Sequence, residues 1–283
     1  MRPANIVTAV ADILAGIAVS GFFLHSTEDY SDVVWLIFST MGLYGGGVVM
    51  NDVFDAELDA VERPERPIPS GLITRTEASI LGVSLLVAGV FFASLASVYS
   101  GLLAAAIAIA AVVYDKWGKH HSFLGPFNMG VCRGLNLMLG LSIIPAQVGE
   151  FWFLGIVPVV YIAAITMISR DEVYGGKKST LYGAAILYAL AMGGIFYISI
   201  SQDQQMATIF FIALWAFMVF LPLQKAIQKP EGRLIGRAVK AGVLALILMN
   251  AAWASAFGFI YLALIIILLL PLSILLAKVF AVT

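Results

Sequence analysis

The stretch that decides the fold runs from Val33 to Gly71, "VVWLIFSTMGLYGGGVVMNDVFDAELDAVERPERPIPSG". Its first half is apolar and close to the roughly 20 residues that a helix needs to cross a bilayer. Its second half changes to acids and then to arginines and prolines. This change in composition predicts a membrane-spanning helix that ends in a polar segment at the membrane surface, with side chains able to bind ions or take part in catalysis.

Composition extends this interpretation to the whole chain. Of 283 residues, 61% are hydrophobic and 12% are charged, whereas soluble domains carry roughly 25% charged residues. The net charge of −1 gives no indication of a nucleic-acid partner, and the single cysteine, Cys132, excludes a disulfide framework within the chain. We therefore expect an all-α, polytopic transmembrane bundle that forms one domain, residues 1–283.

Ten segments are apolar enough to be transmembrane helices, and none shows the alternation typical of a membrane β-barrel. They lie near residues 4–24, 32–51, 77–98, 101–115, 124–145, 151–169, 180–200, 207–225, 234–256 and 258–281. Only "AFGF" divides the last two, so nine helices is the alternative count. The first segment contains Asp12 and is long for a signal peptide, so we expect it to be retained as a helix.

Lysine and arginine are distributed unevenly among the connections between these segments. The odd-numbered connections contain neither residue, whereas the even-numbered ones hold most of the chain's 16 basic residues. The positive-inside rule then places both termini and all polar motifs on the cytoplasmic side. The basic connection after the eighth segment also fits attraction to anionic lipid headgroups.

Three acids and an amide share one helical face at the end of the second segment. Asp52, Asp55 and Asp59 are spaced i, i+3, i+7, and Asn51 is one turn before Asp55. Like charges at this spacing repel unless a cation lies among them. Mg²⁺ fits, because it takes oxygen ligands and commonly joins one or two carboxylates to a substrate phosphate.

Two arginines follow, Arg63 and Arg66, in a loop made stiff by prolines. Guanidinium groups match the geometry of phosphate. A solvated loop that obeys the positive-inside rule is the alternative explanation. It would account for the arginines but not for the aligned acids.

The pattern "NDVFDAELD" followed by "RPERPIPSG" resembles the first motif of the UbiA superfamily of intramembrane prenyltransferases, and "MRPAN" is similar to the start of that family. The resemblance implies two pseudo-equivalent helical halves around a central cavity, each with an acidic motif. It implies Mg²⁺ as cofactor and isoprenyl diphosphate, a hydrophobic acceptor and membrane lipids as partners. It also leads us to expect a bacterial inner membrane.

The segment "YDKWGK" matches the family's connection in which a tyrosine and a lysine contact diphosphate, here Tyr114 and Lys119. Arg133 lies inside a predicted span, where an ionisable residue is functional or paired by default. Two explanations of Arg133 are open. It has a role in the site, or it forms a structural ion pair with a carboxylate such as Asp12.

The family's second acidic motif is altered in this chain. The corresponding segment is "SRDEVYGGKKS", in which Asp171 and Glu172 are adjacent and lysines replace further acids. Adjacent side chains on a helix point about 100° apart, so one acid at most faces a common site. Either lysine charge replaces part of a second metal ion, or the protein binds prenyl diphosphate without ionising it efficiently. The departure resembles the UbiA-like branch of ebo-type gene clusters (EboC).

Together the motifs and the resemblance give each candidate residue an expected role. They imply catalytic roles for Asp55, Asp59 and Asp171, metal binding by Asp52, Asp55, Asp59, Asp171 and Glu172, and diphosphate binding by Asn51, Arg63, Arg66, Tyr114, Lys119, Arg133, Arg170 and Lys177.

The expected function is Mg²⁺-dependent transfer of an isoprenyl group from its diphosphate to an aromatic or lipid acceptor. A family member that binds but does not catalyse is one alternative, favoured by the altered second motif. A carrier or transporter of a prenylated compound is another, although transporters usually place their sites near the membrane midplane. An intramembrane prenyl-diphosphate phosphatase or cyclase is a related possibility.

Overall fold

The structure is a computed structural model that describes residues 3–24, 29–121, 124–170 and 177–279. Within these ranges the chain is helical and has no strands. The α-helices are α1 (Pro3–Val19), α2 (Ser31–Phe54), α3 (Ala56–Glu62), α4 (Arg75–Ala96), α5 (Val98–Lys116), α6 (Leu124–Leu141), α7 (Pro145–Phe151), α8 (Ile156–Arg170), α9 (Lys178–Ser201), α10 (Gln205–Gln228), α11 (Gly232–Leu244), α12 (Leu246–Ala256) and α13 (Ile260–Val279). Short 3-10 helices lie at Phe22–Leu24, Gly118–His120 and Trp152–Gly155.

The helices confirm a polytopic bundle. Eight helical stretches within the described residues are long and apolar enough to span a membrane, counting residues 145–169 and 232–256 as one stretch each. The shorter apolar α1 and the more polar α6 complete the ten segments expected from the sequence. The tenth is a separate helix, because the chain turns at Gly258, whose φ of +86° is a conformation that glycine adopts without strain.

One predicted connection is helical. The segment "PAQVGE", expected to be a loop, forms most of α7. Pro145 occupies the first turn, where its missing N–H has no helical partner to lose and its fixed φ favours helix. The bundle therefore gains a short helix between α6 and α8.

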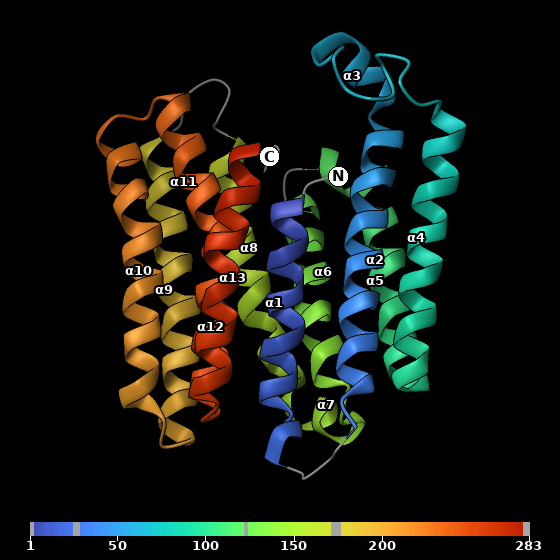
Figure 1. Ribbon diagram of the computed structural model, residues 1–283. Coiled ribbons are helices and arrows are strands. Elements are labelled where there is room, and N and C mark those ends of the chain that lie inside the picture. Colours follow the sequence, from blue (N-terminus) through green and yellow to red (C-terminus); the bar gives the residue numbers. More distant parts are fainter. Residues whose placement is uncertain (1–2, 25–28, 122–123, 171–176, 280–283) are drawn as a thin grey trace.

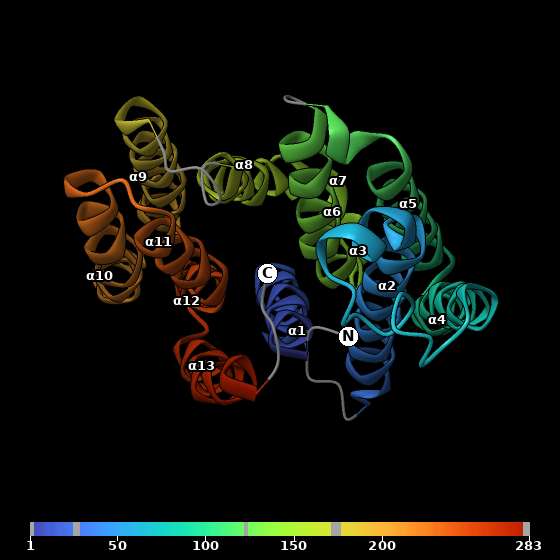
Figure 2. The same cartoon turned by 90° about the horizontal axis from the view of Figure 1, so that it is seen from above.

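α1 lies at the junction of two hydrophobic cores. Residues of α2, α4 and α5 build one core, residues of α8 to α13 build the larger one, and both include side chains from α1 and α6. Accordingly α1 contacts α2, α6, α12 and α13, and Figure 2 shows it between the two groups of helices.

Close helix contacts depend on glycine at the α1–α6 interface. A Cβ on Gly140 would lie 2.3 Å from the carbonyl oxygen of Ile13, and a Cβ on Gly16 would lie 2.3 Å from that of Leu137. Small residues at such crossings let backbones approach, which is the main source of packing energy between helices in lipid. This contact fixes the relative positions of Asp12 on α1 and Arg133 on α6.

The motif-bearing segments lie at one end of the bundle. α3, which carries the last acid of the first motif, is at the same end of the bundle as the start of α1 and the end of α13 (Figure 1). The second helix ends at Phe54, so Asp55 stands at the junction of α2 and α3, although its N–H still donates to the carbonyl of Asn51 at 2.9 Å. The acids therefore continue a helical path, as expected, but through a slight break.

Candidate functional site

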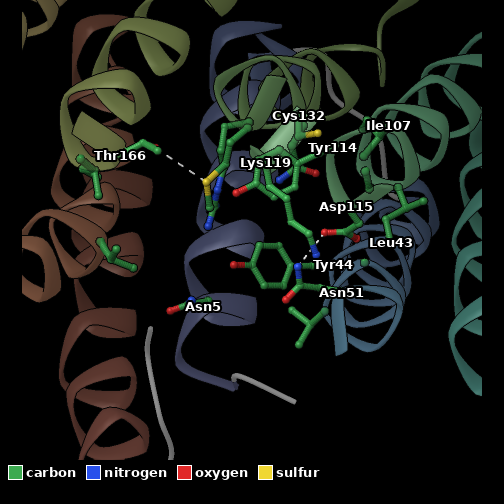
Figure 3. A pocket seen from close by; sticks show the side chains of 18 of the residues that line it. Asn5, Leu43, Tyr44, Asn51, Ile107, Tyr114, Asp115, Lys119, Cys132 and Thr166 are labelled. Carbon is green, nitrogen blue, oxygen red and sulfur yellow. Dashed lines mark hydrogen bonds between the residues drawn. The ribbon is translucent and has the colours of Figure 1, made fainter. Parts of the chain in front are cut away.

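A cavity of about 460 Å³ opens among α1, α2, α5, α6, α8 and α11. Much of its surface is apolar, from side chains such as Leu43, Ile107 and Val239. Most of its polar residues fall into two groups. One lies beside the first motif, and the other lies around Tyr44, two turns earlier on α2. Figure 3 shows Asn51, Asp115 and Lys119 gathered on one side, with Thr166 across from them.

The outer polar group consists of two hydrogen-bonded pairs. Asn51 and Asp55 are one helical turn apart, whereas Asp115 lies in the last turn of α5 and Lys119 in the 3-10 helix Gly118–His120 that follows it. The Asn51 amide donates to Oδ1 of Asp115 at 2.9 Å, and the Lys119 ammonium donates to Asp55. All four line the cavity, together with Tyr114 and Arg63. The structure thus brings six residues predicted for the site to one cavity: Asn51, Asp55, Arg63, Tyr114, Lys119 and Arg133.

The other acids of the first motif face an arginine instead. Nη1 of Arg66 lies 2.7 Å from Oδ2 of Asp59 and 3.3 Å from Oδ1 of Asp52. None of these three is among the side chains that line the cavity. Asp59 is buried, so the ion pair compensates its charge and holds the proline-rich loop against α3. The predicted single stripe is therefore divided between the cavity and this ion-pair cluster.

The second acidic motif falls largely outside the described residues. Asp171 and Glu172 lie there, and nothing is described of the Arg170 side chain. Ser169, just before them on α8, lines the cavity. Lys177 is exposed immediately before α9 and is not part of the cavity lining. The roles expected for this segment stay predictions.

Arg133 forms the ion pair with Asp12 that was one of the two alternatives set out from the sequence, and its role in the site stays a prediction. Its Nη1 donates to Oδ2 of Asp12 at 2.7 Å, and its Nη2 donates to Oγ1 of Thr8 at 2.7 Å. Its guanidinium carbon also lies 5.2 Å from the centre of the Tyr44 ring, and Arg133 and Tyr44 both line the cavity. The arginine is thus a buried structural partner and part of the cavity wall.

Sequence reasoning assigned no role to two residues that the cavity includes. Asp115 was given no role beside Tyr114; it lies in the last turn of α5, just before the 3-10 helix that carries Lys119. Tyr44 lies within an apolar span, where an aromatic side chain is expected to pack against neighbouring helices. Only the contact between α2 and α6 shows that it faces a cation.

The donor set fits Mg²⁺ shared with a phosphate. Within the part of the chain that the structure describes, no three His, Cys, Asp or Glu side chains come close enough to enclose a metal ion. Mg²⁺ does not need such a cage, because it retains waters and uses one or two carboxylates plus phosphate oxygens. Asp55 and Asp115 supply two carboxylates on one cavity wall.

Comparison with known proteins identifies the family of this chain. The UbiA prenyltransferase family model matches residues 13–181, which include both acidic motifs and the segment with Tyr114 and Lys119. The chain belongs to the UbiA prenyltransferase family. It is an integral membrane protein of that family, as its apolar helices indicate.

Similar proteins include digeranylgeranylglyceryl phosphate synthase of Methanothrix thermoacetophila, which is 35% identical over 175 residues, 61% of each chain. The match spans about three fifths of the length of the first such curated relatives, at 61% and 60%. A UbiA homologue from Aeropyrum pernix K1 has a TM-score of 0.72 at 15% identity over 89% of this chain and 98% of its own. One from Archaeoglobus fulgidus, bound to DMAPP and Mg²⁺, has a TM-score of 0.63 at 16% identity over 87% and 98%. These likenesses confirm the UbiA fold.

Proposed function

We propose that this protein is a Mg²⁺-dependent intramembrane prenyltransferase, which transfers an isoprenyl group from its diphosphate to an aromatic or lipid acceptor. The observation that supports this most is how charged and apolar side chains are distributed over the cavity wall. It has carboxylates and cations at the first motif, and an apolar wall beyond them. A diphosphate with an isoprenoid tail has the same division between a charged head and an apolar body.

Each element of the outer group has a part in this proposal. Lys119 and Arg63 supply positive charge toward the diphosphate, and Tyr114 supplies a hydroxyl donor. Asp55 and Asp115 supply oxygen ligands, and Asn51 holds the Asp115 carboxylate in place. Bound Mg²⁺ would stabilise the negative charge that develops on diphosphate as it leaves. The apolar wall keeps water away from the electron-poor isoprenyl carbon.

Named relatives support the reaction class. The curated relatives are digeranylgeranylglyceryl phosphate synthases, and a solved homologue binds DMAPP with Mg²⁺.

We place the site on the cytoplasmic side, because the basic connections share its end of the bundle. The sequence led us to expect a bacterial membrane, and the relatives from methanogens make an archaeal membrane equally compatible. The narrower likeness to the ebo-type branch stays a prediction.

A binding protein without efficient catalysis is the second candidate. The observation behind it is the segment "SRDEVYGGKKS", where lysines stand in place of further acids. In that case prenyl diphosphate would bind, but its carbon–oxygen bond would not break at a useful rate.

Release of diphosphate from geranyl, farnesyl and geranylgeranyl diphosphate by the purified protein separates these functions. Mg²⁺-dependent release that is lost in Asp55→Asn supports the transferase. The matched control is Glu57→Gln, because Glu57 is exposed and forms its ion pair with exposed Arg75. Tight binding without release, in the presence of a membrane lipid extract as a source of acceptors, would favour the binding protein. No binding at all would overturn both.

A further inference from the structure

The second polar group of the cavity lies deeper in the bundle than the first motif. It consists of Asp12, Thr40, Tyr44, Arg133 and Asn136, here named the inner cluster; all but Asp12 line the cavity. The carboxylate of Asp12 is its centre. It accepts hydrogen bonds from Arg133 at 2.7 Å, from Asn136 at 3.0 Å and, from behind, from Asn250 on α12 at 2.7 Å.

The inner cluster is too far along the bundle to share the diphosphate site. Tyr44 precedes Asn51 by seven residues on α2, which is about 10 Å along a helix axis. Long side chains on a helix also point toward its N-terminus, which for Tyr44 is away from Asn51. Arg133 is held at this depth by Asp12, Thr8 and the Tyr44 ring.

Bundle stability alone does not account for this arrangement. A buried ion pair contributes little net stability compared with apolar packing, because both charges lose their hydration. Inside a membrane span such groups mark functional sites by default. Here Arg133 and Asn136 also face a cavity rather than a closed core. An isoprenoid tail has no polar atoms to match them.

We propose that the inner cluster binds the polar head of the acceptor, and that this head is uncharged, such as a phenol, enol or alcohol. The inference rests on the proposed transferase function. The charge of Asp12 cancels that of Arg133, so the cluster offers hydrogen bonds without net charge. An anionic head would bind poorly, because the Arg133 cation is already paired with Asp12. The Tyr44 ring and the Arg133 guanidinium, whose carbon lies 5.2 Å from the ring centre, both line the cavity, and each can pack against an aromatic or enolic ring.

A matched pair of probes tests this assignment, 4-hydroxybenzyl alcohol and 4-hydroxybenzoate, which have similar size and differ in charge at neutral pH. Binding is measured by titration of the full-length protein in detergent, with Mg²⁺ and the unreactive S-thiolo analogue of geranylgeranyl diphosphate bound. The neutral probe should bind the native protein at least tenfold more tightly than the anion. Tyr44→Leu should weaken it about tenfold without changing the affinity for the analogue.

Asp12→Asn tests the charge argument, because it leaves Arg133 with an uncancelled positive charge. The preference should then shift toward 4-hydroxybenzoate by at least tenfold. If Asp12→Asn fails to fold, Arg133→Gln with Asp12→Asn keeps the cluster neutral, and the neutral probe should remain preferred.

Equal affinity for the two probes in the native protein would overturn the inference, as would failure of the neutral probe to bind. A Tyr44→Leu variant that loses the prenyl analogue would also overturn it and assign the cluster to the donor. Failure of the analogue itself to bind with Mg²⁺ would instead overturn the proposed function, so the two failures are distinguishable.

Discussion

The side-chain amide of Asn51 donates to Oδ1 of Asp115 at 2.9 Å, which ties α2 to α5 at the polar end of the cavity. The bond orients a buried carboxylate that lines the same cavity as Asp55. In an apolar surrounding, a buried carboxylate opposes the binding of diphosphate unless a cation joins the two. Asp115 should therefore affect metal-bound and metal-free substrate in opposite directions.

Asp115→Asn should weaken the Mg²⁺-dependent binding of prenyl diphosphate about tenfold and leave metal-free binding unchanged or tighter. Isothermal titration with and without Mg²⁺ measures both quantities. The matched control is Asp203→Asn, because Asp203 is exposed in the turn between α9 and α10. Equal weakening under both conditions would mean that Asp115 only supports the fold.

Lys119 should contribute to substrate affinity through its charge. Lys119→Met removes the cation that faces Asp55 in the cavity, and hydrogen bonds to charged groups are worth about 1.5–3 kcal/mol. The dissociation constant for prenyl diphosphate should rise at least tenfold. Lys116→Met is the control, since Lys116 is exposed and contacts Trp117. Similar affinities for the two variants would exclude Lys119 from the diphosphate site.

The sequence predicted the architecture because hydropathy and basic residues alone determine most of it. Ten segments and the polar end of the second helix follow from local composition, whereas the cytoplasmic orientation of their ends stays a prediction. The turn at "AFGF" was predicted as the preferred of two helix counts and is confirmed, although this segment is nearly as apolar as the spans around it. The positive φ of Gly258 depends on the backbone path.

Side-chain pairing could not be predicted from the sequence. Helical spacing placed Asp52, Asp55 and Asp59 on one face, yet Arg66 contacts only two of them, because the proline-rich loop returns along α3. The pairing of Asp12 with Arg133, 121 residues apart, was one of two alternatives. Only the close contact between α1 and α6 shows that the two side chains meet.

The α1–α6 interface makes a prediction about stability. Gly140→Ala would place a methyl group 2.3 Å from the Ile13 carbonyl oxygen. Separation of the two backbones would strain the ion pair between Asp12 and Arg133, and overpacking of this kind costs about 1–3 kcal/mol. The thermal transition in detergent should fall by several degrees. Gly193→Ala is the control, since a Cβ there meets nothing within 4 Å. A Gly140→Ala variant as stable as Gly193→Ala would contradict the close contact.

Arg66 should stabilise the proline-rich loop rather than contact substrate directly. Arg66→Gln leaves the buried Asp59 carboxylate without its ion pair, which should destabilise the protein by about 2 kcal/mol. Arg75→Gln breaks an exposed pair with Glu57, and such pairs contribute about 0–1 kcal/mol. Denaturation in detergent at two salt concentrations compares them. The effect of Arg66→Gln should persist at high salt, whereas any effect of Arg75→Gln should disappear, because salt screens exposed charges much more than buried ones. Equal sensitivity to salt would place the Arg66 cluster at the solvent surface.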